Sequence, residues 1–304
     1  MHLLCLDDRG GWGRELLAAA QARGWRASLL QTNGHQVVAD YAFMRINQGG
    51  VRMEEEKRLL WRLASLGVRT IPELQYGLLY ENKLGQAHAF RDWMPATRVL
   101  TDPAGARRAV GELGYPFLSK SADGSASRNV RLIHNADQAE TEIQLAFGAG
   151  LPTPHRLGTG IQKGYLIWQR FLGGNAYDYR VIAVGRQRLL LRRHNRPDVP
   201  FASGSGLCEP ITDLDPETTA VLEASNAFFA AARTNWCGID LVRDPDSQQW
   251  RVLEITLGWS MKAYLPCRFI NTRRSGAEIW TVLLDELEAG VFEVDLTEEC
   301  ACAS

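Results

Sequence analysis

The first part of the chain alternates short apolar runs with helical patterns. An apolar run at 3–6 predicts a strand, and leucine and alanine at helical spacing predict a helix over 14–23. A second strand is expected at 25–30, which completes a βαβ-like opening. Further elements are predicted in this order: a strongly amphipathic helix over 53–66, an extended segment at 68–71 and a short helix over 73–80.

The middle of the chain repeats the alternation with shorter elements. The pattern predicts helices over 84–93, 104–113 and 136–147, and strands at 98–100, 117–120 and 129–133. A polar loop of small residues, 123–127, follows the strand at 117–120. Residues 148–164 are rich in glycine, proline and threonine, and therefore predict a linker.

The last part of the chain is mostly sheet. Strands are predicted at 165–171, 179–184, 187–193, 237–243 and 249–255, and helices over 216–233 and 278–287. A polar loop is expected at 199–206. The order of elements predicts a mixed α/β and α+β architecture of three units: 1–80, 81–155 and 156–304.

Composition narrows the class of protein. The 304 residues carry 34 basic and 35 acidic side chains, a net charge of 34 − 35 = −1, which argues against a dedicated nucleic-acid binder. No apolar run approaches the ~18 residues of a membrane span, and the first residues lack the basic start of a signal peptide. Six cysteines form no Cys-x-x-Cys pair. We therefore expect a reduced, cytoplasmic protein without a nucleic-acid or membrane partner, either an enzyme or a binding protein.

Two carboxylates are candidates for a metal site. Asp240 and Glu254 lie in apolar strands joined by the turn sequence 244–247. If those strands pair, both carboxylates emerge on one face, where they repel each other unless a cation or a proton intervenes. Oxygen ligands with room for phosphate suit Mg²⁺. The alternative interpretation is that both residues are ion-paired or exposed.

Two lysines are candidates for holding a phosphate. Lys83 follows Asn82 at the start of a predicted helix, and Lys120 ends an apolar strand beside the loop that contains Ser125. A lysine in such a place is a common phosphate ligand. The alternative is a lysine that lies along apolar surface with its ammonium in water.

These features, together with residues 166–171 followed by 177–181, come in an order that resembles the ATP-grasp superfamily. The resemblance is greatest to its ribosomal-protein glutamate ligase and glutathione synthetase branch, and it spans roughly residues 50 to 265. It implies an ATP-grasp fold with an N-terminal α/β domain (1–80), a small central α+β lid (81–155) and a C-terminal α+β domain (156–304). ATP would lie between the last two.

The resemblance also assigns a role to individual residues. Those implied to bind ATP are Lys83, Lys120 and Ser125 at the phosphates, Gln169, Arg170, Phe171 and Leu172 at the adenine, and Asp178 near the ribose. Arg180 and Arg193 are implied to be catalytic, near the phosphates or the acyl substrate. Asp240 and Glu254 match the Mg²⁺ ligands, with Thr256 at the place of a usual asparagine ligand.

Several positions depart from the family pattern. The hinge usually carries Gln-Glu and here reads Gln169-Arg170, while Ser127 and Asn129 occupy glycine positions of the phosphate loop. The loop 257–262 lacks the usual Pro-Gly, so the substrate is expected to be unusual for the family.

The activity that the resemblance implies is an ATP-dependent carboxylate–amine ligase that works through an acylphosphate. Mg²⁺, with Mn²⁺ as an alternative, would be the metal. The partners would be a small-molecule carboxylate and an amine, with a free amino acid and a peptide both open, and the chain is a candidate homo-oligomer because relatives often are. Two alternatives are an ATP-binding regulatory module without ligation and an ATP-dependent kinase of a small molecule.

Overall fold

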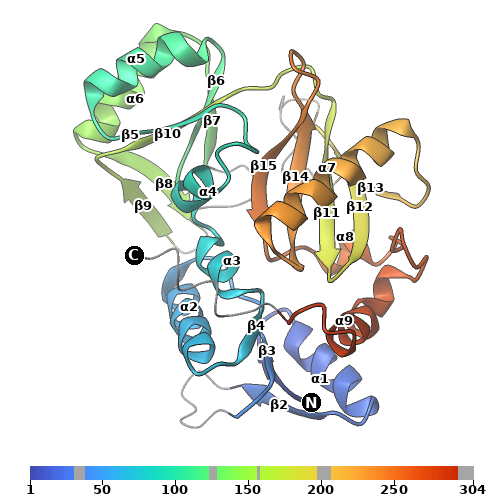
Figure 1. Cartoon of the computed structure of the whole chain (residues 1–304). Helices are drawn as coiled ribbons and strands as arrows, with labels where there is room; N and C mark the ends of the chain where they lie inside the picture. The colour runs from blue at the N-terminus through green and yellow to red at the C-terminus, as the bar shows by residue number, and fades with distance from the viewer. Residues whose placement is uncertain (31–37, 123–128, 156–157, 197–206, 294–304) are drawn as a thin grey trace.

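The computed structural model describes residues 1–30, 38–122, 129–155, 158–196 and 207–293 (Figure 1). Within these ranges the strands form one parallel sheet near the N-terminus and antiparallel sheets after it. The predicted mixed α/β and α+β architecture is confirmed. Of the sequence candidates, Ser125, Ser127 and the predicted loop 199–206 lie outside the described residues.

The N-terminal sheet is parallel, with strand order β2-β1-β3-β4. Its strands are β1 (His2–Leu6), β2 (Arg26–Leu30), β3 (Tyr41–Phe43) and β4 (Arg69–Ile71), and its helices are α1 (Trp12–Ala22), α2 (Gly50–Ser65) and α3 (Leu74–Leu79). The two inner strands, β1 and β3, are buried nearly throughout, as expected for parallel strands covered on both faces. Strand β3 was not predicted, because three residues are too few to show a period.

The middle sheet is antiparallel, with order β5-β10-β6-β7. Its strands are β5 (Thr97–Leu100), β6 (Phe117–Lys120), β7 (Val130–Ile133) and β10 (Leu166–Arg170); nearby helices are α4 (Lys83–Ala89), α5 (Pro103–Leu113) and α6 (Ala136–Phe147). Alternation along the strands sends Phe117 and Trp168 into a core with α5 and α6. Lys120, three residues after Phe117, and Gln169, the residue after Trp168, therefore face the opposite side of the sheet.

The prediction of a linker at 148–164 was wrong. This segment contains β8 (Leu151–His155) and β9 (Gly158–Gln162), which pair with each other antiparallel. Buried Leu151 joins the core of α6, and Gln162 accepts a hydrogen bond from the backbone of Ala122. Pairing through backbone groups requires no apolar alternation, so glycine and proline concealed these strands.

The C-terminal sheet is antiparallel, with order β13-β12-β11-β14-β15. Its elements are β11 (Tyr177–Val184), β12 (Gln187–His194), β13 (Cys208–Ile211), α7 (Pro216–Ala232), β14 (Trp236–Arg243), β15 (Trp250–Thr256), α8 (Met261–Tyr264), a 3₁₀ turn (Gly276–Glu278) and α9 (Ile279–Glu288). Helix α7 begins with a capping box between Asp215 and Thr218 and covers one face of the sheet. The edge strand β13 was not predicted.

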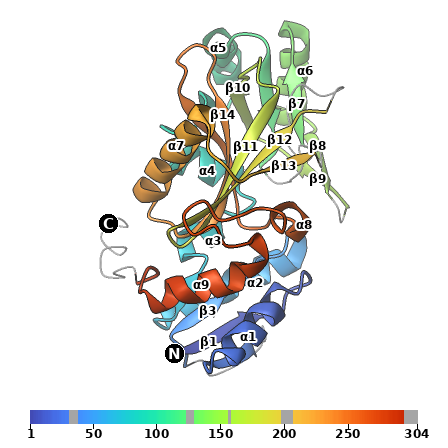
Figure 2. The ribbon, with the colours of Figure 1, turned by 90° about the vertical axis from the view of Figure 1, so that its right-hand side faces the viewer.

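The N-terminal and C-terminal sheets share their apolar cores. One cluster joins residues of β1, β3 and α2 to the α7 face of the C-terminal sheet, and another joins α1 to the opposite face and α9. Helix α9 lies beside α1 in both ribbon views (Figure 2), where Arg23 pairs with Asp285 and the indole of Trp280 donates to Glu15. The middle sheet has a core of its own.

The division into units 1–80, 81–155 and 156–304 stays a prediction. Strand β10 follows residue 155 in the chain but pairs with β5 and β6 of the middle sheet. None of the described helices is long and apolar enough to cross a membrane.

Candidate active site

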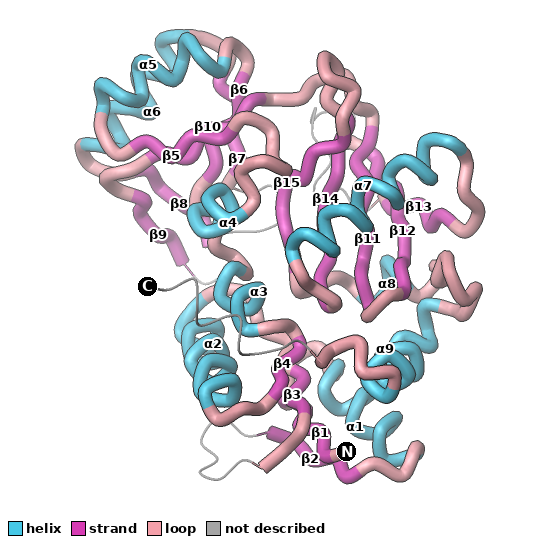
Figure 3. The backbone as a smooth tube through the Cα atoms, viewed as in Figure 1, coloured by secondary structure: helices cyan, strands magenta, loops and turns pink. Residues whose placement is uncertain are grey.

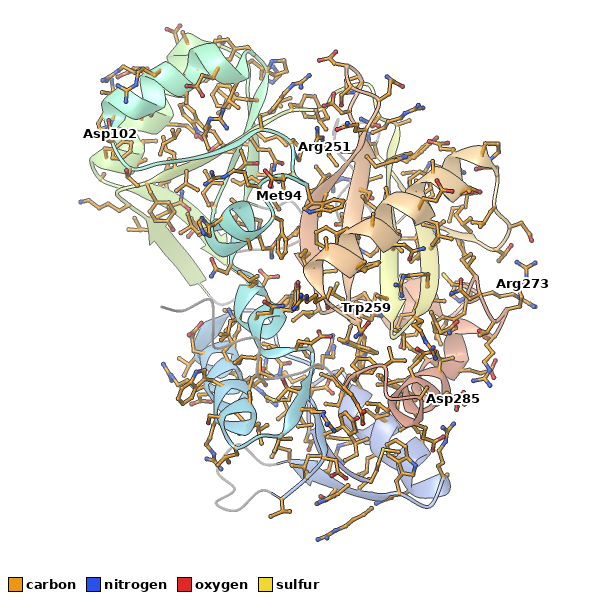
Figure 4. The ribbon with its side chains drawn as sticks, viewed as in Figure 1. Met94, Asp102, Arg251, Trp259, Arg273 and Asp285 are labelled. Atoms are coloured by element: carbon orange, nitrogen blue, oxygen red, sulfur yellow. The ribbon has the colours of Figure 1, made fainter. Side chains whose placement is uncertain are left out.

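A narrow pocket lies where the middle sheet meets β15. Helix α4 lies between the middle sheet and β15 (Figure 3). It is lined by Lys83, Gln86, Ala87, Met94, Thr97, Lys120, Ile167, Gln169 and Leu253. Met94 marks its position between the middle sheet and β15 in Figure 4. The structure thus brings both candidate lysines and the first hinge residue to one pocket.

Lys83 stands at the first turn of α4. The side chain of Asn82 accepts a hydrogen bond from the backbone of Gly85 (3.0 Å) and so caps the helix. Lys83 is nearly buried, and its Nζ lies 3.6 Å from Oε1 of Glu254 on β15. A predicted phosphate ligand and a predicted metal ligand therefore face each other across the boundary between the sheets.

Gln86, one turn further along α4, holds this helix against β15. Its amide donates to the carbonyls of Leu79 (3.0 Å) and Ile255 (3.2 Å) and accepts from the backbone N–H of Ile255 (3.0 Å). This residue was not singled out from the sequence. A glutamine in a helix carries no signal of burial, and its partner Ile255 lies 169 residues away.

Lys120 ends β6 and points to the same side as Lys83. The pKa of its ammonium is lowered to about 8, mainly because the side chain is buried. Glu254 and Asp240 raise this pKa, and the charge of Lys83 lowers it, but burial outweighs them. An added anion stabilises a poorly solvated cation more strongly than it stabilises an exposed lysine.

Four further side chains form a buried ionic network on β11, β12 and β14. Asp240 accepts from Arg180 through Nε (2.7 Å) and Nη2 (2.8 Å). Arg193 donates to Asp178 through Nε (2.6 Å) and Nη2 (2.7 Å), and its Nη2 also lies 2.7 Å from Asp240. The two predicted catalytic arginines are thus positioned by two carboxylates, in the bidentate geometry that suits guanidinium.

The two aspartates of this network respond differently to burial. Burial raises the pKa of Asp178, and Arg193 only partly offsets it. Burial acts on Asp240 in the same direction, but the charges of Arg180 and Arg193 outweigh it and lower its pKa. Asp240 is therefore the ionised anchor that both arginines share.

The hinge residues lie at the end of β10. Gln169 is buried in the pocket, Leu172 is buried and Phe171 is half-buried. The side chain of Arg170 turns instead to the β14–β15 turn, where it pairs with Asp246 and lies 3.6 Å from Asp244. The arginine at the usual glutamate position thus has acidic partners of its own.

The two predicted carboxylate ligands lie directly opposite each other. Asp240 on β14 pairs in register with Glu254 on β15, next to a bulge after Asp240. The two strands therefore pair, which is the condition under which both carboxylates emerge on one face. Thr256 lies on the same strand as Glu254, and its hydroxyl donates to the carbonyl of Gly258 (2.9 Å).

This donor set fits a metal ion that arrives with phosphate. In the described part of the chain, no group of three or more His, Cys, Asp and Glu residues could hold a metal ion. Mg²⁺ commonly uses one or two carboxylates and completes its shell with phosphate oxygens and water. Glu254 is the more accessible ligand, because both oxygens of Asp240 already accept from arginines.

No family model matches the chain, and no curated protein sequence matches it. Solved structures do match. A RimK domain ATP-grasp protein from Sphaerobacter thermophilus is 18% identical, with a TM-score of 0.60 over 94% of this chain and 99% of that chain.

Two further structures give the same result. D-alanine–D-alanine ligase from Bacillus anthracis is 14% identical, with a TM-score of 0.63 over 96% of this chain and 97% of that chain. The ATP-grasp ligase PsnB, in complex with precursor peptide PsnA2 and AMPPNP, is 16% identical, with a TM-score of 0.60 over 94% and 96%. The chain therefore has the ATP-grasp fold over most of its length, and the predicted fold is confirmed.

Proposed function

We propose that this chain is an ATP-dependent carboxylate–amine ligase, which forms an amide bond through an acylphosphate. The observation that carries the proposal is the convergence of Lys83, Lys120 and Glu254 at the boundary between two sheets. The matched structures include ligases, among them one complexed with ATP and one complexed with precursor, Mg and ADP. The arrangement suits a triphosphate, because two poorly solvated lysines face the carboxylate that would hold its metal.

The side chains have distinct roles in this proposal. Lys83 and Lys120 bind the phosphates of ATP, and the hinge 169–172 binds the base, with Asp178 near the ribose. Arg180, held by Asp240, stands closest to solvent among the network residues and neutralises charge on the transferred phosphoryl group. Arg193 keeps Asp178 and Asp240 in place. Glu254 and Asp240 would hold Mg²⁺ or Mn²⁺, which neutralises phosphate charge when bound.

The proposed reaction has two steps and no covalent intermediate with the protein. A carboxylate oxygen of the substrate attacks the γ-phosphorus, and the bond from phosphorus to the β–γ bridging oxygen breaks to release ADP. The amine nitrogen then attacks the acyl carbon, the carbon–oxygen bond to phosphate breaks, and the amine proton passes to the released phosphate. The protein must exclude water between the two steps, because an acylphosphate hydrolyses.

The finer assignments also belong to the proposal. The branch is that of ribosomal-protein glutamate ligase and glutathione synthetase, and the substrates are a small-molecule carboxylate and an amine of an amino acid or a peptide. A solved match, PsnB, is complexed with a peptide. The units 1–80, 81–155 and 156–304 would serve as the N-terminal domain, the lid and the C-terminal domain.

The test uses the purified full chain with ATP, Mg²⁺ and pooled carboxylates and amines. We expect phosphate release that requires both pools, and trapping of an acyl hydroxamate when hydroxylamine replaces the amines. Lys120→Ala should weaken ATP binding, and Glu254→Gln should abolish metal-dependent release while circular dichroism stays unchanged. ADP formation with one substrate and a stable phosphorylated product would establish a kinase instead. ATP binding without turnover in any mixture would establish a regulatory module.

A further inference from the structure

The two polar atoms of the Gln169 side-chain amide differ in their hydrogen bonding. Gln169 on β10 lies opposite Thr97 on β5, and its Nε2 donates to the hydroxyl of Thr97 (2.8 Å). The side chain is 1% exposed, and its Oε1 has no hydrogen-bond partner among the residues that the structure describes. A buried acceptor without a donor costs free energy, so its presence in a native structure requires an explanation.

The direction of this amide follows from the hydrogen bonds of Thr97. The Thr97 hydroxyl donates its single proton to the carbonyl of Pro95 (2.7 Å), and that carbonyl can only accept. Toward Gln169 the hydroxyl can therefore only accept, so the NH₂ group must face Thr97. The oxygen of the amide is then left facing away from Thr97, on the residue that lines the pocket beside Lys83 and Lys120.

The acceptor without a donor therefore belongs to a residue of the pocket wall. Gln169 and Thr97 share the face of the middle sheet that carries Lys120. If the phosphates of a nucleotide bind to the two lysines, the side-chain amide of Gln169 lies where the base would bind. A purine with a 6-amino group brings a donor to the orphaned oxygen. A 6-oxo purine places a second acceptor opposite the first at this position, and the two oxygens repel each other.

We infer that Thr97 is a specificity-determining positioning residue: by fixing the amide of Gln169, it selects a 6-amino purine nucleotide over a 6-oxo purine nucleotide. The inference rests on the proposed function, because it assumes that the pocket takes a nucleotide. Thr97 acts through Gln169 and need not touch the base.

The experiment compares ATP with inosine triphosphate, in which a 6-oxo group and a protonated ring nitrogen replace the 6-amino edge. Isothermal titration with Mg²⁺ gives the dissociation constant of each nucleotide. We expect the wild-type chain to bind ATP at least tenfold more tightly than inosine triphosphate. In Thr97→Val the amide is free to rotate by half a turn, and the preference should fall to threefold or less, mainly through tighter binding of inosine triphosphate.

Two variants separate this role from a structural one. Thr97→Ser keeps the hydroxyl and should keep the wild-type preference. Thr141→Val removes a hydroxyl that donates to the carbonyl of Asp137 on exposed α6, and should leave both dissociation constants unchanged. If Thr97 has only a structural role, Thr97→Val should weaken the binding of both nucleotides by the same factor. This outcome would overturn the inference.

The remaining outcomes distinguish the two proposals. If the wild-type chain binds ATP and inosine triphosphate within twofold of each other, the inference is wrong and the proposed function stands. An unchanged preference in Thr97→Val likewise overturns only the inference. If the wild-type chain binds neither nucleotide, the proposed function is wrong and the inference falls with it.

Discussion

At the scale of single residues, seven charged side chains among the described residues form the candidate site. The cations are Lys83, Lys120, Arg180 and Arg193, and the carboxylates are Asp178, Asp240 and Glu254, which gives a local charge of 4 − 3 = +1. The arginines are paired with aspartates, whereas the lysines stand at the pocket wall. The excess of positive charge therefore lies where a phosphate would bind.

Lys120 should make nucleotide binding depend on pH. Its pKa of about 8 means that the ammonium is charged at pH 7 and mostly neutral at pH 9, so ATP affinity should fall about tenfold between them. In Lys120→Arg the guanidinium stays charged, and the affinity should vary much less over this range. Equal slopes in the two proteins, measured by isothermal titration, would contradict the assignment of Lys120 to the phosphates.

The same pKa has a consequence for stability. Between pH 8 and pH 10.5 the unfolded chain holds the proton of Lys120 more strongly than the folded chain does. The contribution of this residue to the free energy of unfolding therefore increases as the pH rises through that window.

The two predicted metal ligands should differ in their structural importance. Asp240→Asn leaves Arg180 and Arg193 without their shared anion, and should lower the free energy of unfolding by about 3–5 kcal/mol. Glu254→Gln removes a 3.6 Å contact with Lys83 at a more accessible position, and should cost about 1 kcal/mol or less. Urea unfolding measures both values, and a larger loss in Glu254→Gln would show that Glu254 is the structural residue.

At the scale of elements, β15 is an edge strand that is covered rather than exposed. Its outer edge is met by the Gln86 amide at Ile255 and by the carbonyl of Trp93 at Val252. Backbone groups at a sheet edge bind other strands unless they are covered or paired. The cover also fixes α4, and therefore places Lys83 against Glu254.

Removing this cover should be costly. In Gln86→Leu the N–H and C=O groups of Ile255 lose their partners, and we expect the free energy of unfolding to fall by about 2–4 kcal/mol. Gln144→Leu, on the exposed face of α6, is the matched control and should change it by less than about 0.5 kcal/mol. Urea titrations of the two variants make the comparison. If they are equally stable, Gln86 does not fasten α4 to β15.

At the scale of the whole molecule, the N-terminal and C-terminal sheets share apolar cores, whereas the middle sheet has a core of its own. Trp12 of α1 contacts Trp236, Trp259, Tyr264 and Trp280 of the C-terminal part, with ring centroids 5.3–6.4 Å apart. The guanidinium of Arg45 lies 4.7 Å above the same ring. The core of the middle sheet, in contrast, contains among the described residues only those between Leu100 and Trp168.

We therefore expect the N-terminal and C-terminal sheets to unfold together. Hydrogen exchange of Trp12→Leu should speed up in β1 and in α9 by a similar factor, while α5 and α6 keep the wild-type rate. Trp168→Leu should have the reverse effect, because its ring packs in the core of the middle sheet. Faster exchange throughout the chain in both variants would indicate a single cooperative body.

The sequence by itself determined the elements with strong local patterns. The helix predicted over 136–147 is α6, Ala136–Phe147, and the strand predicted at 117–120 is β6, Phe117–Lys120. It also placed Asp240 and Glu254 on two strands joined by a short turn, and the structure shows that these strands pair. The order of its motifs indicated the ATP-grasp fold, which the solved structures confirm.

Only the tertiary structure decided the contacts that these elements make. The sequence did not reveal that Asp240 is held by Arg180, 60 residues away, or that Gln86 fastens α4 to β15. It also missed β3, β8, β9 and β13, which are short or rich in glycine and proline. The physical reason is the range of each interaction. Periodicity, caps and turns act over a few neighbouring residues, whereas the partner of a buried charge or amide depends on which distant strand the fold brings beside it.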